Sequence, residues 1–301
     1  MATPDWIAVD WGTSRLRVWA MSGGSVYAKA SSDQGMGTLS PDQFEPALLS
    51  LIEDWLEKYG PLPLLACGMV GAKQGWVEAP YVPVPCKPSQ AKLCQAPNRD
   101  PRLFMQIAPG LSQNAPPDVM RGEETQIAGF LALNPGWDGV MCLPGTHTKW
   151  AHISAGEVVS FQSFMTGELL ALLSNHSVLR LTLTDEGWAD DAFATGVNDS
   201  LSRPQRLAAE LFTLRADALL HGTEAAQSRA RLTGLLIGAE LAAARPYWLG
   251  QQVAVIGGGA QVKSYCSALR IVGLSPVEAD GSAMTRAGLW AIRQHQKTKA
   301  Q

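Results

Sequence analysis

The chain has 301 residues, of which 46% are hydrophobic and 17% charged, and its formal net charge is −3. This composition predicts a globular protein of one large domain or two, and it excludes a disordered chain. No cluster of Lys and Arg indicates a nucleic-acid surface, no apolar run is long enough to span a bilayer, and no signal peptide is visible. We therefore expect no nucleic acid or membrane as a partner, and a cytoplasmic location.

The metal-ligating residue types are dispersed along the sequence. Five cysteines form no C-x-x-C pair and five histidines form no ligand cluster. This pattern indicates a reducing compartment and argues against structural zinc. A metal in this protein is expected to come with a phosphate ligand, as Mg²⁺ does.

The chain opens with two strand-like runs, 6–9 and 16–21, separated by the turn Gly12-Thr13-Ser14-Arg15. A third strand is expected at 25–30. Asp10 ends the first run, which is an unusual place for a carboxylate if the strand is buried.

A helix is predicted over 44–59. Ser40 and Gln43 form a capping box around Pro41, and Gly60-Pro61 ends the helix. A buried strand follows over 62–67. The Gly- and Pro-rich stretch 68–118 is then expected to be a long loop, and its length suggests a function.

The second half repeats the opening pattern. After a helix over 123–133 come a buried strand from Val140, a turn, and strands at 148–154 and 157–163. Further helices are predicted at 168–174, 203–221, 231–244 and from about 283, with a glycine-ended strand after Gln252 and a short strand near 276–278.

The two hairpin turns are alike. Gly145-Thr146-His147-Thr148-Lys149 interrupts its apolar hairpin as Gly12-Thr13-Ser14-Arg15 does. Duplicated halves predict two similar lobes with a cleft between them, and we place the boundary between 1–134 and 135–301, with the last helix packing back on the first lobe as an option.

Turns of this kind suit phosphate. Exposed backbone N–H groups and hydroxyls form anion-binding nests, and Arg15 and Lys149 add positive charge. Two such turns could bind one nucleotide's phosphates, with Asp10 holding Mg²⁺ directly or through water. The alternative is that Asp10 caps a tight turn and that Thr13 and Ser14 are ordinary turn residues.

Three glycines, Gly257, Gly258 and Gly259, end a strand and open a helix, where a phosphate could bind. A dinucleotide-binding fold is an alternative, since Glu278 lies where a ribose-binding acid could. Val262 replaces the third glycine, however, and too few residues follow for that fold. No P-loop motif occurs.

Three motifs carry a resemblance. "DWGTSRLRVW", "LPGTHTKW" and "VIGGGA" resemble the two phosphate motifs and the adenosine motif of the actin-like ATPase / sugar kinase superfamily. "CGMVGAKQGWVEAPYVPVP", "MRGEETQIAG", "SFMTGELLALL" and "GLLIGAEL" resemble the 2-dehydro-3-deoxygalactonokinase family, from Ile7 to about Trp290.

The resemblance implies an α/β protein with two ribonuclease-H-like lobes and an interlobe cleft. It implies a kinase that uses ATP and Mg²⁺ to phosphorylate the 6-hydroxyl of 2-dehydro-3-deoxy-D-galactonate in galactonate catabolism. Many sugar kinases begin the second phosphate loop with Asp, whereas this chain has Pro144. The base must come from elsewhere, and "MRGEETQIAG" resembles a segment of exopolyphosphatases whose Glu is catalytic.

Glu123 is accordingly the first candidate base and Glu124 the second, although two acids in a first helical turn could merely complement the helix dipole. For the sugar acid, the loop after the strand 62–67 lies where related kinases bind sugar. The candidates for its carboxylate are Arg15, Lys73 and Arg121, and surface charge is the alternative for each. The remaining substrate candidates are Gly68, Met69, Val70, Trp76, Thr166, Gly167 and Glu168, with Tyr81 and Trp76 weighed as packing residues and Thr166 as an N-cap.

The phosphate and adenosine candidates are Gly12, Thr13, Ser14, Arg15, Gly145, Thr146, His147, Thr148, Lys149 and Gly257 to Gly259. His147 is expected to donate a hydrogen bond to a phosphate. Three other functions stay open: a kinase for the 2-dehydro-3-deoxygluconate epimer, a phosphatase of the same fold, and a sugar-sensing protein. A homodimer is also left open.

Overall fold

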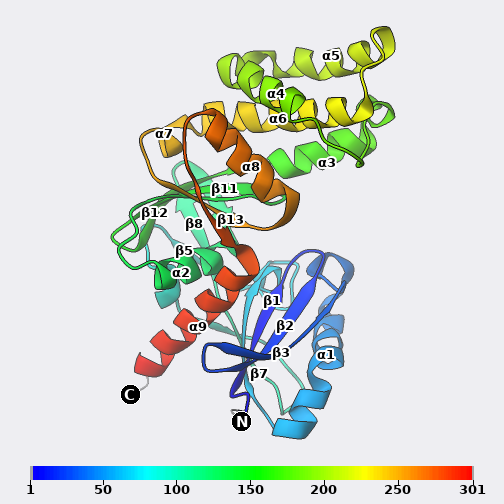
Figure 1. Cartoon of the computed structure of the whole chain (residues 1–301). Coiled ribbons are helices and arrows are strands. Elements are labelled where there is room, and N and C mark those ends of the chain that lie inside the picture. The colour runs from blue at the N-terminus through cyan, green and yellow to red at the C-terminus, as the bar shows by residue number, and fades with distance from the viewer. Residues whose placement is uncertain (1–2, 300–301) are drawn as a thin grey trace. The chain divides into compact units, whose positions relative to one another are not determined.

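The computed structural model describes residues 3–299 and divides the chain into two compact units. Unit 1 comprises residues 1–137, 153–160 and 280–301, and unit 2 comprises 138–152 and 161–279. Figure 1 labels helices and strands of both units where there is room, and each unit is described by itself.

Unit 1 is built on a six-stranded sheet. Its order is β3-β2-β1-β4-β7-β6, in which β1 is antiparallel to β2 and parallel to β4. The strands are β1 (Trp6–Trp11), β2 (Leu16–Ser22), β3 (Ser25–Ser32), β4 (Pro63–Gly68), β6 (Cys94–Gln95) and β7 (Phe104–Ile107). The predicted opening hairpin and third strand are confirmed.

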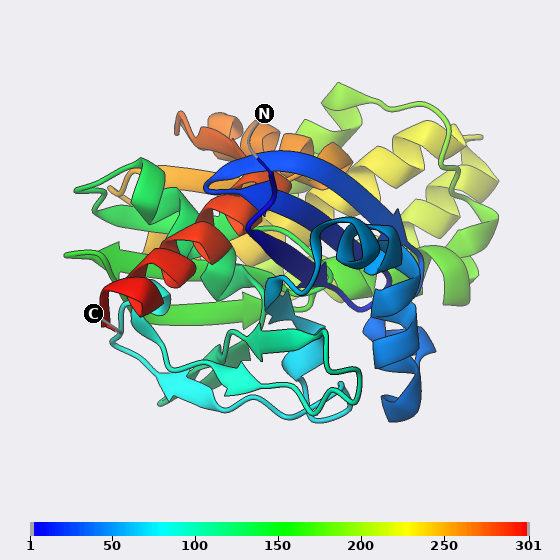
Figure 2. The ribbon, with the colours of Figure 1, turned by 90° about the horizontal axis from the view of Figure 1, so that it is seen from below.

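Alternation along β1 sends its side chains to two different layers. Ile7, Val9 and Trp11 pack on α1 (Phe44–Tyr59), whose predicted bounds are confirmed. The predicted capping box of Ser40 and Gln43 is present, but it belongs to the 3-10 turn Pro41–Gln43 that leads into α1. Trp6 and Ala8 pack instead against α9 (Gly281–Lys299) on the opposite face. In Figure 2 this C-terminal helix, in red, lies beside the blue strands. Asp10 has the parity of Trp6 and Ala8, so its carboxylate lies on the α9 side.

The helix α2 (Glu123–Leu133) has its predicted bounds and packs closely on α9. A Cβ at Gly129 would lie 1.9 Å from the carbonyl oxygen of Met284, and one at Gly288 would lie 1.9 Å from that of Thr125. Glycine at these two positions lets the helix backbones touch. The start of α2 is therefore fixed against the face of the sheet that carries Asp10.

The expectation of a long loop over 68–118 is wrong. This stretch contributes β6 and β7 to the main sheet and forms a second sheet with β9 in the order β5-β8-β9. The new strands are β5 (Tyr81–Pro83), β8 (Gly110–Asn114) and β9 (Pro117–Met120). These strands have two to five residues each and stand among prolines, so neither length nor alternation revealed them.

A third sheet, of five strands, has the order β12-β11-β10-β13-β14, which repeats the arrangement of the first five strands of the six-stranded sheet. Its strands are β10 (Gly139–Leu143), β11 (Thr148–Ser154), β12 (Glu157–Phe164), β13 (Val253–Gly257) and β14 (Val277–Asp280). The predicted internal repeat is thus confirmed at the level of strand order. In both sheets the Gly-Thr turn joins the central strand to its antiparallel neighbour.

Helices of unit 2 cover this sheet and form a further helical layer, shown in green and yellow in Figure 1. They are α3 (Thr166–His176), α4 (Asp190–Ser202), α5 (Leu207–Leu220), α6 (Ala225–Ala243), α7 (Arg245–Trp248) and α8 (Gly259–Ile271). The helix α4 was not predicted. It packs on α6 so closely that a Cβ at Gly234 would lie 2.2 Å from the carbonyl oxygen of Phe193.

Among residues 3–299, no helix combines the length and apolarity needed to cross a membrane.

Candidate active site

The first Gly-Thr turn is held in place by the segment that follows β3. The carbonyl oxygens of Gly12 and Thr13 accept hydrogen bonds from the N–H groups of Met36 and Gly37, at 3.0 and 2.9 Å. A Cβ at Gly35 would lie 2.3 Å from the carbonyl oxygen of Thr13, so only glycine allows this approach. The turn therefore has a fixed shape before any ligand binds.

The outer side of this turn offers unused donors. Within the described residues, no backbone acceptor takes the N–H of Thr13 or Ser14, and both residues are exposed. Arg15 is also exposed and forms an ion pair with Asp33 at 3.2 Å. An exposed pair of this kind stabilises the fold by at most about 1 kcal/mol, so Arg15 can turn to another anion.

Asp10 ends β1 beside this turn and is 7% exposed. Arg17 is its partner in the β1–β2 register and approaches the carboxylate to 2.7 Å, from Nη2 to Oδ2. Arg17 also donates to Ser282 Oγ on α9 at 2.9 Å. Burial raises the pKa of Asp10, and the charge of Arg17 lowers it in part.

Two glycines bring the end of β4 and the start of α2 next to Asp10. Gly68 has a φ of +91° and its Cβ would lie 2.6 Å from the carbonyl oxygen of Trp11, while Gly122 has a φ of +106° and packs on Gly68. L-residues rarely adopt these angles. Cys67, the register partner of Asp10, lies in the field of Asp10 and of Glu124, and its pKa is well above the usual value mainly because it is buried.

The two adjacent acids of α2 differ in their surroundings. Glu124 is 2% exposed and accepts hydrogen bonds from the Gly122 N–H at 2.6 Å and from Thr125 Oγ1 at 3.0 Å. Burial, together with the nearby Glu123, raises the pKa of Glu124 to about 8. Glu123 is half-buried and accepts from the Arg121 N–H at 3.1 Å. A substrate could therefore reach Glu123, whereas Glu124 holds the turn that carries it.

Arg121 has unused hydrogen-bonding capacity. Its guanidinium lies 4.3 Å from the ring centroid of Tyr81, and Nη2 donates to the Ala79 carbonyl at 2.8 Å. Within the described residues, Nε and Nη1 are buried and have no hydrogen-bond partner. Buried donors without partners are costly, so this cation suits an anionic ligand.

The remaining substrate candidates between residues 69 and 76 do not offer buried unpaired polar groups as Arg121 does. Val70 and Trp76 are buried in the core of unit 1, where Trp76 packs against Trp11 and Phe44, as the core-packing alternative has it. Lys73 is exposed and Met69 is half-buried.

A magnesium ion is the metal to test against these residues. Among residues 3–299, no three His, Cys, Asp or Glu side chains gather into a metal-binding group. Mg²⁺ held by one carboxylate, phosphate oxygens and water needs no such group. Asp10 fits that requirement as a single buried carboxylate beside the turn, although its Oδ2 is already ion-paired with Arg17 at 2.7 Å.

In unit 2, the second Gly-Thr turn is bound to the start of α3. A Cβ at Gly167 would lie 2.1 Å from the Gly145 carbonyl oxygen, and the Glu168 N–H donates to the Thr146 carbonyl at 2.9 Å. The side chains of His147 and Glu168 pair at 2.6 Å. The structure therefore joins the predicted segments 145–149 and 166–168.

Not every predicted residue of this turn is accessible. Thr146 and His147 are exposed, but Thr148 is fully buried and hydrogen-bonded to Tyr265 Oη at 2.8 Å. Lys149 is buried as well. Thr166 is the first residue of α3 rather than its N-cap, which is Met165.

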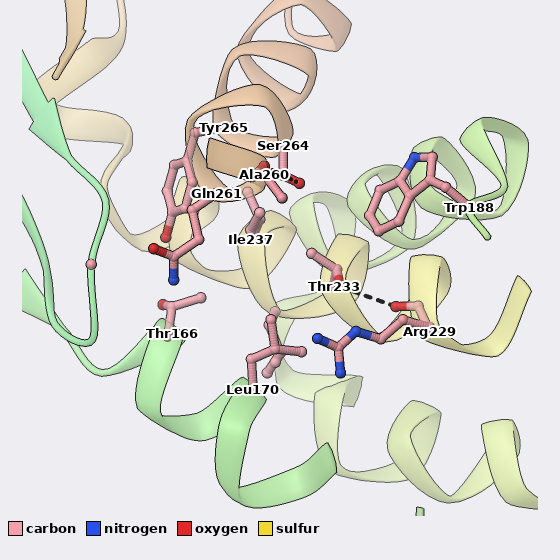
Figure 3. Close-up of a pocket in the computed structure, with 13 residues that line it drawn as sticks. Thr166, Leu170, Trp188, Arg229, Thr233, Ile237, Ala260, Gln261, Ser264 and Tyr265 are labelled. Atoms are coloured by element: carbon pink, nitrogen blue, oxygen red, sulfur yellow. Dashed lines mark hydrogen bonds between the residues drawn. The ribbon is translucent and has the colours of Figure 1, made fainter. Parts of the chain in front are cut away.

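A cavity of about 120 Å³ lies between α3, α6 and α8 within unit 2, and a neighbouring cavity of about 450 Å³ shares Trp188, Ala260 and Ser264 with it. In Figure 3, Thr166, Gln261 and Tyr265 lie at one side of the first cavity and Trp188 and Arg229 at the other. Its lining residues are Gly145, Thr166, Gly167, Leu170, Trp188, Arg229, Thr233, Leu236, Ile237, Ala260, Gln261, Ser264 and Tyr265. Segments 145 and 166–167 thus meet the helix that follows Gly257, Gly258 and Gly259.

The sequence did not indicate most of the residues that line this cavity. Leu170, Leu236 and Ile237 read as core residues of amphipathic helices, and Trp188 lies in a stretch with no motif. It also did not indicate Glu240 of α6, which is 3% exposed behind the cavity. Only a glutamate within an otherwise apolar helical run could have indicated it.

Known proteins resemble this chain over nearly its whole length. The family model described as 2-keto-3-deoxy-galactonokinase matches residues 10–292. A protein of Rhizobium meliloti (strain 1021), named as a probable 2-dehydro-3-deoxygalactonokinase, is 37% identical over 94% of this chain and 95% of its own. The 2-dehydro-3-deoxygalactonokinase of Escherichia coli (strain K12) is 34% identical over 96% and 98%.

Solved structures agree. A crystal structure from Sinorhizobium meliloti, assigned the same kinase activity, has a TM-score of 0.87 at 36% identity and covers 96% of this chain and 98% of that one. The activator of 2-hydroxyisocaproyl-CoA dehydratase from Clostridium difficile, solved with bound ADPNP, has a TM-score of 0.52 at 10% identity over 98% and 97% of the two chains, which shows a common fold alone. The chain belongs to the 2-keto-3-deoxy-galactonokinase family.

Proposed function

We propose that this protein is an ATP-dependent kinase that transfers the γ-phosphoryl group of ATP to the 6-hydroxyl of 2-dehydro-3-deoxy-D-galactonate. Membership of the family and the names of the relatives support the substrate. An ATP-dependent enzyme of this kind is expected in the cytoplasm.

Three glycines carry the proposal. Gly12, Gly145 and Gly258 have φ outside the left-handed region, and a Cβ on any of them would meet no other atom closer than 3.5 Å. Neither backbone conformation nor packing therefore requires glycine at these positions. Space left open at two Gly-Thr turns and at a helix start is what close approach of phosphate to the backbone needs.

We place the nucleoside of ATP in the cavities of unit 2. Their apolar walls of Leu170, Leu236 and Ile237 suit a base, and the hydroxyls and amide of Thr233, Ser264 and Gln261 can hydrogen-bond to it or to the ribose. The start of α8 then favours the α-phosphate. The turn at Gly145, in the same unit, would bind phosphate oxygens, and the turn at Gly12 is proposed separately as a phosphate-binding turn of unit 1.

Phosphoryl transfer depends on positioning and on charge neutralisation. Asp10 is the residue that would hold Mg²⁺, and the ion would supply charge neutralisation at the phosphates when bound. Glu123 accepts the proton of the attacking hydroxyl as general base, because it is the more accessible of the two acids. Glu124 fixes Gly122, and Arg121, whose Nε and Nη1 have no hydrogen-bond partner among the described residues, binds the carboxylate of the sugar acid.

ATP consumption over a panel of acceptors tests the proposal. We expect turnover with 2-dehydro-3-deoxy-D-galactonate, far less with the gluconate epimer, and none without an acceptor. Equal turnover without acceptor would establish a phosphatase instead, and no consumption with any sugar acid would favour a sensor.

A further inference from the structure

The buried carboxylate of Glu240 joins three walls of unit 2. It accepts hydrogen bonds from Trp150 Nε1 on β11 at 2.7 Å, from Tyr265 Oη on α8 at 2.7 Å, and from Thr166 Oγ1 on α3. Glu240 itself belongs to α6. Four separate elements therefore meet at one side chain.

Two of these donors line the cavity assigned above to the nucleoside, namely Thr166 and Tyr265. Figure 3 shows both residues at the same side of that cavity. The third donor, Trp150, stands on the strand that begins at Thr148, directly after the second Gly-Thr turn. Tyr265 also bonds to Thr148 at 2.8 Å.

The connection extends from Thr166 to the turn itself. Gly167 touches the Gly145 carbonyl, and Glu168 donates to Thr146. A shift of Thr166 would therefore move both the cavity wall and the turn. Glu240 is the one group among these residues that accepts from three elements at once, and it does not face the cavity.

We propose that Glu240 is a positioning residue for nucleotide binding, which sets the spacing between the turn at Gly145 and the first turns of α8 through Thr166, Trp150 and Tyr265. This inference rests on the proposed nucleotide site but names a residue outside it. Burial raises the pKa of Glu240 to about 7, opposed by the three hydrogen bonds, as expected for a costly buried acid.

Two substitutions separate positioning from mere filling of the core. In Glu240→Gln the amide oxygen can accept from Trp150, while the hydroxyls of Thr166 and Tyr265 can rotate to accept from the amide nitrogen. In Glu240→Leu the volume is similar, but all three donors lose their acceptor. A residue that only filled space would tolerate both.

The test is the Kd for ATP, measured by titration calorimetry on the full chain, together with KM for each substrate. We expect Glu240→Leu to raise the Kd and KM for ATP by at least about tenfold and to leave KM for the sugar acid within about twofold. Glu240→Gln should stay within about threefold of wild type. Leu241→Ala, a core substitution at the next position of α6, is the matched control and should lower the thermal midpoint without this selective effect.

Should Glu240→Leu fold poorly, Thr166→Val and Tyr265→Phe test the same network. Each should raise the Kd for ATP, and combined with Glu240→Gln each should give a non-additive effect. Additive effects, an unchanged Kd in Glu240→Leu, or equal losses for ATP and sugar acid as stability falls would overturn the inference.

The outcomes also separate this inference from the proposed function. Wild-type protein that binds ATP but phosphorylates no sugar acid would refute the kinase, while selective loss of ATP binding in Glu240→Leu would still support the role of Glu240. Wild-type protein that binds no ATP would overturn both.

Discussion

The two units share a strand order and a Gly-Thr turn, yet they place their buried acids differently. In unit 1 Asp10 stands two residues before the glycine of the turn, whereas Leu143 stands at the same distance before Gly145. Unit 2 instead buries Glu240 behind its cavity, on a helix.

The hydrogen bonds explain what this difference means. Glu240 is saturated by three donors, which suits a fixed support. Among the described residues, Asp10 is held by one ion pair, with Arg17, so fewer donors compete with a cation for its carboxylate. In the proposed function, unit 1 would supply charged groups for the reaction, and unit 2 would supply a shaped site for the nucleotide.

The largest expected effect on kcat comes from substituting Asp10, the acid that has no counterpart before the Gly-Thr turn of unit 2. We expect Asp10→Asn to lower kcat by at least about 100-fold, because a metal–phosphate charge loses its partner. Burial makes the Asp10 charge costly, so the thermal midpoint should change little. Steady-state kinetics and a thermal scan measure both. Asp33→Asn, at a side chain 88% exposed near the same turn, is the control and should be active; an active Asp10→Asn would remove Asp10 from the reaction.

Glu123→Gln should come next, with kcat lowered by roughly 100-fold or more and ATP binding retained, because a general base is lost but no nucleotide contact is. Single-turnover kinetics with a parallel ATP titration give the two numbers. Turnover at the wild-type rate would move the base to another residue.

Arg121→Met should raise KM for the sugar acid by about tenfold or more and leave KM for ATP near wild type, because a charge-assisted bond to the carboxylate is lost. Initial-rate kinetics with each substrate varied in turn check this. Lys73→Met, at an exposed cation in the same region, serves as control. A matching rise in both KM values would instead indicate a structural role for Arg121.

The smallest effect is on stability. Glu124 has a pKa of about 8 in the folded protein and 4.5 as its ordinary value, so between these pH values the folded state keeps a proton that the unfolded state releases. Stability should therefore fall as pH rises across that window. Glu124→Gln should reduce the fall by roughly 1–3 kcal/mol, measured by urea unfolding between pH 5 and 8.5.

Glu240, with its pKa of about 7, contributes a fall of the same sign that Glu124→Gln leaves in place. A residual slope is therefore expected in that variant. If Glu124→Gln showed the full wild-type slope, Glu124 would not titrate in this range.

The sequence predicted the framework well because local rules determine it. Alternation and caps identified both hairpins and α1, and the repeated Gly-Thr turn predicted the repeated sheet. The short strands β5 to β9 were not predicted because they carry too little local pattern. β5 and β7 also depend on parallel pairing with the distant strands β8 and β4, whereas β8 and β9 form a local hairpin.

For the candidate site, the motifs indicated the two Gly-Thr turns but not the residues that line the cavity of unit 2. Trp76 looked available for a sugar, and only tertiary packing on Trp11 and Phe44 shows that it is core. The positions of Glu240 behind the cavity and of Arg229 at its wall could not be predicted from sequence, because they depend on which elements pack around these side chains in the fold. The two adjacent acids Glu123 and Glu124 could be found from sequence, but their unequal exposure could not.

The most direct test of the account is the affinity for ATP relative to AMP in Gly12→Ala and Gly145→Ala. The added methyl group meets no protein atom closer than 3.5 Å at either position, so both variants should fold normally. We predict that each binds ATP at least about tenfold more weakly and AMP nearly as well as wild type, because the proposed function assigns outer phosphates to each turn. Wild-type affinity for ATP in either variant would contradict the claim that both turns bind phosphate.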